Sequence, residues 1–428
     1  RKWNCTMTHE PLEFEPVVQD ERWSNDDHRS GRRYDRLCLV ASIAVATLSA
    51  LLYFRFQSKE AVDAKPPQAE ACIQSNNYSV KDPSVSLVEG DNDHANSSPS
   101  SYMKQCIATN YSKTTAKTIF ELPLAALLSD HKGQKKFEAS DITIVDDSAY
   151  VVCDSSWAIT KLKLPLQPFS KDNFQIGNPS RVATEESDYE AIFHHGNTFY
   201  AVRESVKLKI SPSKKSSYHA VIEELELSDN DYAVLNECPC EFEFESKKKG
   251  FEGAVAITST YGALIVLGLC EGNFCSEKRK GERGNGRIVL MEKIESGQTY
   301  GGCLWRTVKL VKIPAYVRFG DFSALTMMPD GMVAITSQED SKVWFGRLLG
   351  IDSSGHLDTD RVAFDESYGK IISFPRSESC FASYCNVEGI SFSNNGMVIA
   401  VSDKMKKGGK QDYRCLEKDQ SIHMFALP

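Results

Sequence analysis

Five short stretches of the sequence begin with an oxygen-bearing side chain, continue as an apolar run, turn, and return as a second apolar run that ends in an acid. The leading residues are Ser140, Glu190, Glu252, Ser323 and Glu388, separated by 50, 62, 71 and 65 residues. Hard oxygen ligands suit Ca²⁺, whereas Zn²⁺ favours His and Cys. If the fold brings the five residues together, the three carboxylates repel one another, and the sequence predicts a bound cation among them.

The elements that must position these residues are predicted to be β-strands. From about residue 114 the chain shows short alternating and β-branched runs broken by Asp, Asn and Gly, with hardly any helical periodicity. The spacing accommodates one four-stranded antiparallel sheet per repeat. Radial repetition of such sheets, called blades, is a β-propeller. The outer strands of blades 1 and 2 are expected at residues 180–186 and 240–246. We therefore predict an all-β fold, with a β-propeller over residues 114–428.

Five blades is the number that the repeats favour. The last repeat lacks its outermost strand, which the segment starting at Lys117 can supply; this pairing would close the ring and remove exposed sheet edges. Six blades remain possible if a degenerate blade lies within 205–250. A β-sandwich is the alternative fold, but it does not explain a polar residue at the same place in every repeat.

The innermost strand of each blade runs beside the central channel, so its first residue points to one common volume. Asp141 and Asp321 adjoin this ring and can add ligands. The second strands return to the same face and end in a second set of acids: Asp154, Glu204, Glu271, Glu339 with Asp340, and Asp403. Of these, Asp154, Glu204, Glu271 and Asp403 are candidate general bases. Two alternatives remain, namely that the outer set consists of ordinary turn acids and that the inner glutamates hold water in the channel.

The order Ser, Glu, Glu, Ser, Glu around five blades resembles the calcium-activated nucleotidase (apyrase) family, a family of five-bladed propellers with a central calcium. The resemblance lies in short motifs that cover well under a fifth of the chain: Ser140-Asp141, DYEAI around Glu190, GFEGA around Glu252, Phe322-Ser323-Ala324 and NVEGISF around Glu388. It implies that calcium is bound by Ser140, Asp141, Glu190, Glu252, Ser323 and Glu388. The Glu-Gly and Glu-Ala pairs at which these strands start are also similar, more weakly, to those of esterase-like phytase propellers, whose acidic face binds metal and phosphate.

Residues 37–54 form an uncharged apolar run without proline, long enough for one transmembrane helix. Four arginines (29, 32, 33 and 36) precede it, so the positive-inside rule predicts a cytosolic tail at residues 1–36 and a lumenal or extracellular remainder. Residues 55–113 are polar and read as a stalk, with sequons at Asn77, Asn96 and Asn110. A buried core helix and a cleaved signal peptide are the alternatives, but the long polar flanks and the 36 residues before the run fit both less well.

Composition narrows the classes of partner. The chain carries 50 Lys and Arg against 58 Asp and Glu, a net charge of -8, which argues against nucleic acid as a partner. Thirteen cysteines indicate an oxidising compartment, and the pairs Cys270 with Cys275 and Cys380 with Cys385 are close enough in sequence to form local disulfides.

Other features of the sequence carry weaker signals. The Cys238-Pro-Cys240 pair is expected to belong to a disulfide pattern. His194-His195 is expected in a solvated turn on the face opposite the acids. The basic loop after Glu271 (Lys278, Arg279, Lys280, Arg283 and Arg287) can bind a phosphate ester or simply be solvated.

Two functions therefore remain open. In the first, a membrane-anchored, calcium-dependent hydrolase acts on small phosphate-containing or ester substrates. In the second, the calcium is structural and the propeller is a membrane-tethered binding or scaffold module with a glycoprotein partner. The second draws support from a difference from the apyrases after the first inner strand, where they have two acids followed by Arg and this chain has Cys153, Asp154, Ser155 and Ser156.

Overall fold

The computed structural model describes residues 113–131, 134–182, 184–210, 215–295, 302–377, 381–393, 396–406, 411 and 413–428. The predicted tail (1–36), the transmembrane segment (37–54), nearly all of the stalk (55–113) and the three sequons lie outside these residues. Among the described residues, no helix is long and apolar enough to cross a bilayer.

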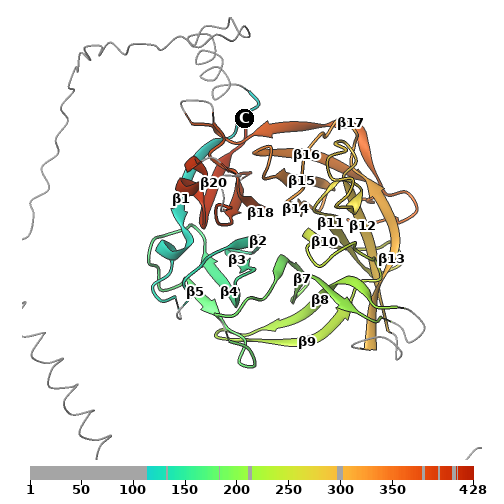
Figure 1. Cartoon of the computed structure of the whole chain (residues 1–428), viewed down its shortest axis with the longest axis horizontal. Helices are drawn as coiled ribbons and strands as arrows, with labels where there is room; N and C mark the ends of the chain where they lie inside the picture. Colours follow the sequence, from blue (N-terminus) through green and yellow to red (C-terminus); the bar gives the residue numbers. More distant parts are fainter. Residues whose placement is uncertain are drawn as a thin grey trace, which may run out of the picture. The chain divides into compact units, whose positions relative to one another are not determined.

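The described chain forms five four-stranded antiparallel sheets arranged around a central axis, with one sheet per repeat (Figure 1). From the innermost strand outward, blades 1 to 3 are β2 Ala139–Val145, β3 Ser148–Cys153, β4 Ser156–Lys163 and β5 Phe174–Ile176; β6 Tyr189–His195, β7 Thr198–Leu208, β8 Ser217–Leu227 and β9 Tyr232–Pro239; and β10 Phe251–Thr258, β11 Leu264–Cys270, β12 Arg287–Glu295 and β13 Cys303–Lys312. Blades 4 and 5 are β14 Ala324–Met327, β15 Met332–Ser337, β16 Lys342–Leu349 and β17 Ala363–Ser373; and β18 Val387–Phe392, β19 Val398–Ser402, β20 Ser421–Ala426 and β1 Lys117–Pro123. The β-propeller with five blades is confirmed, and the described residues of the region 205–250 contain strands of blade 2 alone.

The ring closes through the first described strand. β1 pairs antiparallel with β20, so the N-terminal strand is the outermost strand of blade 5, as predicted. Glu121 of β1 strengthens this closure: its carboxylate contacts Lys418, accepts a hydrogen bond from Tyr384 at 2.8 Å, and lies 3.6 Å from His423 Nδ1. Closure leaves blade 5 with the same four strands as the others and covers the edge of β20.

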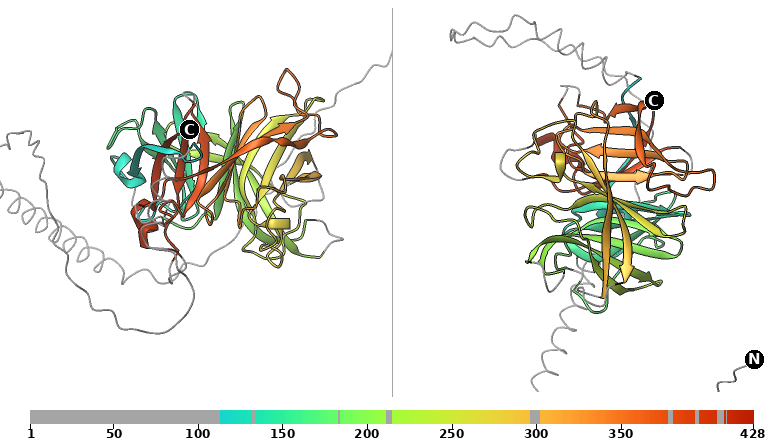
Figure 2. Two further views of the ribbon diagram at one scale, coloured as in Figure 1. Left: turned by 90° about the horizontal axis from the view of Figure 1, so that it is seen from above. Right: turned by 90° about the vertical axis from the view of Figure 1, so that its right-hand side faces the viewer.

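The hydrophobic core is divided into five clusters, and each lies between two neighbouring blades. Between blades 1 and 2, for example, Val152 and Ile159 pack against Tyr189, Ile192 and Ala201. Both faces of each sheet are therefore buried, which explains the nearly continuous apolar runs of the second strands, such as LIVLGLC and VIAVS. A sandwich has one core between two sheets, so this distribution excludes it. Figure 2 shows strands of several blades running across the thickness of the ring.

Two outer strands and one disulfide differ from the prediction. The outer strand of blade 1 is Phe174–Ile176 rather than 180–186, and that of blade 2 is Tyr232–Pro239 rather than 240–246. The Cys270–Cys275 disulfide is confirmed, but Cys385 pairs with Cys415, so the prediction that it pairs with Cys380 is wrong. Cys238 joins Cys303 and links the outer strands of blades 2 and 3, whereas Cys240 is a buried free thiol.

Candidate functional site

The five innermost strands β2, β6, β10, β14 and β18 surround the axis, and each contacts the innermost strands of the two neighbouring blades (Figure 1). All five begin at the same end of the channel, where the predicted ring residues Ser140, Glu190, Glu252, Ser323 and Glu388 lie. In blades 1, 2, 3 and 5 the pairing register skips the ring residue, as at a β-bulge. Because a bulged residue leaves the regular ladder, its side chain can be directed away from the sheet and toward the axis.

The three ring glutamates form one electrostatic cluster. Burial raises the pKa values of Glu190, Glu252 and Glu388 well above the usual range, and repulsion adds to this effect: Glu190 is repelled by the other two, and Glu388 by Glu252. No hydrogen bond or ion pair joins these carboxylates to the part of the chain that the structure describes. The three carboxylates therefore lie close enough to repel one another, and no described residue holds their oxygens by a hydrogen bond or an ion pair.

Glycine allows the inner strands to approach closely beside two of these glutamates. A Cβ at Gly253 would lie 2.4 Å from the backbone nitrogen of Leu325 in β14, and one at Gly389 would lie 2.7 Å from Asp141 Cα in β2. Both distances are shorter than van der Waals contact, so any side chain there would push neighbouring blades apart. The recurring Glu-Gly pair thus has a physical reason, because the same close approach that needs glycine brings the glutamates together.

The other predicted ring residues are bound to neighbouring strands. Asp141 accepts hydrogen bonds from the backbone N–H groups of Ile142 (2.8 Å) and Ile192 (2.9 Å), which ties blade 1 to blade 2. Ser323 donates to the carbonyl of Val387 at 2.9 Å, which ties blade 4 to blade 5. Ser140 is buried. Asp141 and Ser323 therefore cross-link the inner strands, and the carboxylates without such partners are the three glutamates.

Two acids of the predicted outer set lie together at the junction of blades 1 and 5. Burial, followed by repulsion from Asp403 and Glu138, raises the pKa of Asp154 to about 7. Burial, partly offset by the backbone N–H of Lys404, raises the pKa of Asp403 to about 6. Each keeps one carboxylate oxygen that is buried and has no hydrogen-bond partner among the described residues. Acids with pKa values near neutrality can exchange a proton at physiological pH, as a general base must.

Two of the remaining outer acids, Glu271 and Asp340, form ion pairs. Lys249 Nζ lies 2.5 Å from Glu271 Oε2. Glu204 has a raised pKa because of burial and the nearby Asp188 carboxylate. Asp340 pairs with Arg283 at 2.9 Å, which places part of the predicted basic loop on the acidic face. Glu271 is therefore less suited than Asp154 or Asp403 to accept a proton.

Lys406 was not anticipated from the sequence. It follows β19 of blade 5, and its ammonium group donates a hydrogen bond to Gln338 Oε1 of blade 4 at 3.2 Å. Burial opposes its charge, but Glu388, Asp403, Glu252 and Asp321 outweigh burial and raise its pKa. The only signal in the sequence was its position three residues after Asp403, in a loop whose path the sequence does not specify. A tethered cation therefore lies beside the ring.

The donor set at this end of the channel has the chemistry that a hard divalent cation requires. Oxygen ligands and negative charge come from the three glutamates, which accept no hydrogen bond from a described residue, and from Asp154 and Asp403, which each have one carboxylate oxygen without a described partner. Within the described ranges, no three His, Cys, Asp or Glu side chains already stand at ligand distances around one point. The residues thus fit Ca²⁺ by type and charge, and a bound ion would have to draw the glutamates inward.

Comparison with known proteins shows only distant similarity. No family model and no curated protein matches the sequence. Similar solved structures include glutaminyl cyclase of Myxococcus xanthus, with 11% identity over 73% of this chain and 96% of that chain and a TM-score of 0.37. Aldose sugar dehydrogenase of Streptomyces coelicolor, solved with PQQ bound, has 9% identity over 73% of this chain and 98% of that chain, with a TM-score of 0.38. Periplasmic gluconolactonase of Pseudomonas aeruginosa has 11% identity over 63% of this chain and 64% of that chain, with a TM-score of 0.29. These matches are too distant to bear on activity, and the five-bladed β-propeller rests on the strand order and inter-blade packing described above.

Proposed function

We propose that the acidic end of the channel binds Ca²⁺ and hydrolyses phosphate esters of small molecules, in a protein anchored in the membrane through residues 37–54 with its propeller in the secretory-pathway lumen or outside the cell. The observation that carries the proposal is the cluster of three mutually repelling glutamates that have no hydrogen-bond or ion-pair partner among the described residues. The resemblance to the apyrases in the ring order supports the choice of calcium and of a phosphate-containing substrate. The anchor and the glycosylated stalk rest on the sequence alone.

In this proposal Glu190, Glu252 and Glu388 hold the cation, with Asp141, Ser140 and Ser323 as further oxygen ligands or as fixed supports of the ring. When bound, Ca²⁺ would neutralise negative charge on a phosphoryl group. Asp154 accepts the proton of the attacking water, because its pKa near 7 suits a base at neutral pH, and Asp403 is the second candidate. Glu204 and Glu271 are weaker candidates for this role. Lys406 attracts the anionic substrate toward the channel mouth.

One observation favours the alternative, a non-catalytic propeller with a structural cation that binds a glycoprotein partner. Asp141 and Ser323 already act as cross-links between blades, so the ring contributes to stability without any substrate. In this alternative, calcium would add a further link between the inner strands, and the outer set would consist of ordinary turn acids.

Phosphate release by the purified full-length protein separates the two. The substrates are a nucleoside diphosphate and phytate, each assayed with Ca²⁺, with Mg²⁺ and with a chelator. The enzyme proposal expects calcium-dependent release that is abolished by Glu252→Gln and retained by Glu282→Gln, a matched change at an exposed acid that pairs with Arg279. A calcium-dependent rise in melting temperature without release would refute hydrolysis of these substrates and support the structural role.

A further inference from the structure

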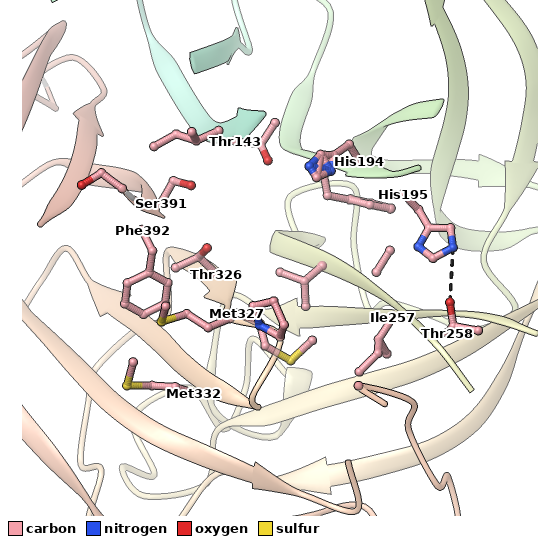
Figure 3. A pocket seen from close by; sticks show the side chains of 18 of the residues that line it. Thr143, His194, His195, Ile257, Thr258, Thr326, Met327, Met332, Ser391 and Phe392 are labelled. Atoms are coloured by element: carbon pink, nitrogen blue, oxygen red, sulfur yellow. Dashed lines mark hydrogen bonds between the residues drawn. The ribbon is translucent and has the colours of Figure 1, made fainter. Parts of the chain in front are cut away.

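A cavity lies at the end of the channel opposite the ring of acids. Its volume is about 920 Å³, and all five blades line it through the later residues of their innermost strands. Thr143 of β2, His194 of β6, Thr326 of β14 and Ser391 of β18 gather around one opening, with Ile257 of β10 beside it (Figure 3). Small-molecule sites in proteins commonly have volumes of about 300 to 1,000 Å³, so this space is of ligand size.

The lining of this cavity is uncharged. None of the residues that line it is an Asp, Glu, Lys or Arg, although these types make up 25% of the chain. Its apolar lining includes Val255, Ile257, Met327, Met332 and Phe392. Methionine side chains are flexible and adapt their shape to a ligand. An ion of either sign would find no opposite charge here and would lose its hydration, so charge complementarity selects a neutral ligand.

A few polar groups are placed to orient such a ligand. His194 was expected in a solvated turn, but it belongs to β6 and is half-buried, with its ring against Phe199. Its Nδ1 is buried and has no hydrogen-bond partner among the described residues. Burial and the neighbouring His195 lower the pKa of His194, so its ring is neutral at physiological pH and offers either a donor or an acceptor. The hydroxyl groups of Thr143 and Thr326 lie nearby (Figure 3).

We propose that this cavity is a binding site for an uncharged, mainly apolar small molecule that carries a hydroxyl or similar polar group. The methionines, Phe392 and the aliphatic side chains take the apolar part, and the His194 ring with the adjacent hydroxyls takes the polar part. The site lies at the opposite end of the five inner strands from the acidic ring, so it is separate from the proposed calcium site and does not depend on hydrolysis.

A matched pair of ligands tests the charge argument directly. The full-length protein in lipid nanodiscs is labelled with ¹³C at its methionine methyl groups and titrated with 1-octanol or with octanoate, which share their chain but differ in charge. Octanol should shift the resonances of Met327 and Met332 saturably, and octanoate should need about tenfold higher concentration. Met291, which is fully buried between blades 2 and 3, is the internal control and should not move.

Two variants locate the response. Thr143→Trp fills the cavity without adding charge and should abolish the shifts. Leu235→Trp adds the same side chain at an exposed position on β9 outside the cavity, and should leave the shifts of both methionines unchanged within about twofold. The proposal is overturned if octanol leaves both methionines unmoved, if octanoate acts at the same concentration as octanol, or if Thr143→Trp has no effect while the protein remains folded.

Discussion

Replacing Gly253 with alanine tests the close packing on which the ring depends. The new Cβ would lie 2.4 Å from Leu325 N and 3.0 Å from the Ala324 carbonyl carbon. Ordinary contacts are about 3.5 to 4 Å, so β10 and β14 would have to separate by about 1 Å. The clashing atoms are mostly backbone, which cannot move aside as a flexible side chain can. We expect a cost of about 3 kcal/mol, at the upper end for overpacking of a core, which lowers the melting temperature by about 6 °C.

The matched control is Gly177→Ala. No atom lies within 4 Å of a Cβ at Gly177, so alanine there should be neutral or stabilise by up to about 1 kcal/mol by reducing the entropy of the unfolded chain. The assay is thermal and urea unfolding of both variants without divalent ions, followed by calcium titration. We expect Gly253→Ala also to weaken calcium binding, because Glu252 is its neighbour. If Gly253→Ala is as stable as Gly177→Ala, the close approach of the inner strands is refuted.

Three further predictions concern charges. Glu121→Gln should lower the free energy of unfolding by about 1 to 2 kcal/mol at pH 7 because it weakens the closure of the ring. His423, followed by Lys418, lowers the pKa of Glu121 to about 2. The stability that Glu121 contributes is therefore present above about pH 4.5 and is lost as pH falls through about 2. Equal urea midpoints at pH 7 for wild type and variant would contradict this prediction. Because the pKa of Asp154 is raised to about 7, its contribution to stability is full below about pH 4 and is lost as pH rises through 7. Without divalent ions, the melting temperature of Asp154→Asn should therefore fall less between pH 5 and 8 than that of the wild type. An equal fall in both proteins would contradict this prediction. Lys406→Met should strengthen calcium binding about tenfold in a calorimetric titration because it removes a competing cation, and weaker binding would show that the lysine supports the site instead.

The inner part of each blade could be predicted from the sequence because two constraints coincide there. The second strands are buried on both faces and read as apolar runs, and the first strands begin with a polar residue at a bulge. The closing strand was also predictable, since Lys117–Pro123 is a short amphipathic strand that has no partner nearer in the sequence.

The outer strands and the lysine were not predictable in the same way. Outer strands are partly exposed, so their composition is less constrained. β5 has only three residues, and β9 is exposed or half-buried from Ala233 to Glu237. The position of Lys406 depends on a loop fixed by contacts distant in sequence, including the hydrogen bond from its backbone N–H to Gln411 and the Cys385–Cys415 disulfide nearby. Side-chain periodicity contains no information about such contacts.

Isothermal titration of the full-length protein with Ca²⁺ tests the central claim most directly. The account predicts saturable binding of one ion per chain that is weakened by Glu190→Gln, Glu252→Gln and Glu388→Gln and unchanged by Glu282→Gln. Absence of saturable binding at millimolar calcium, or binding that all four variants retain equally, would contradict it.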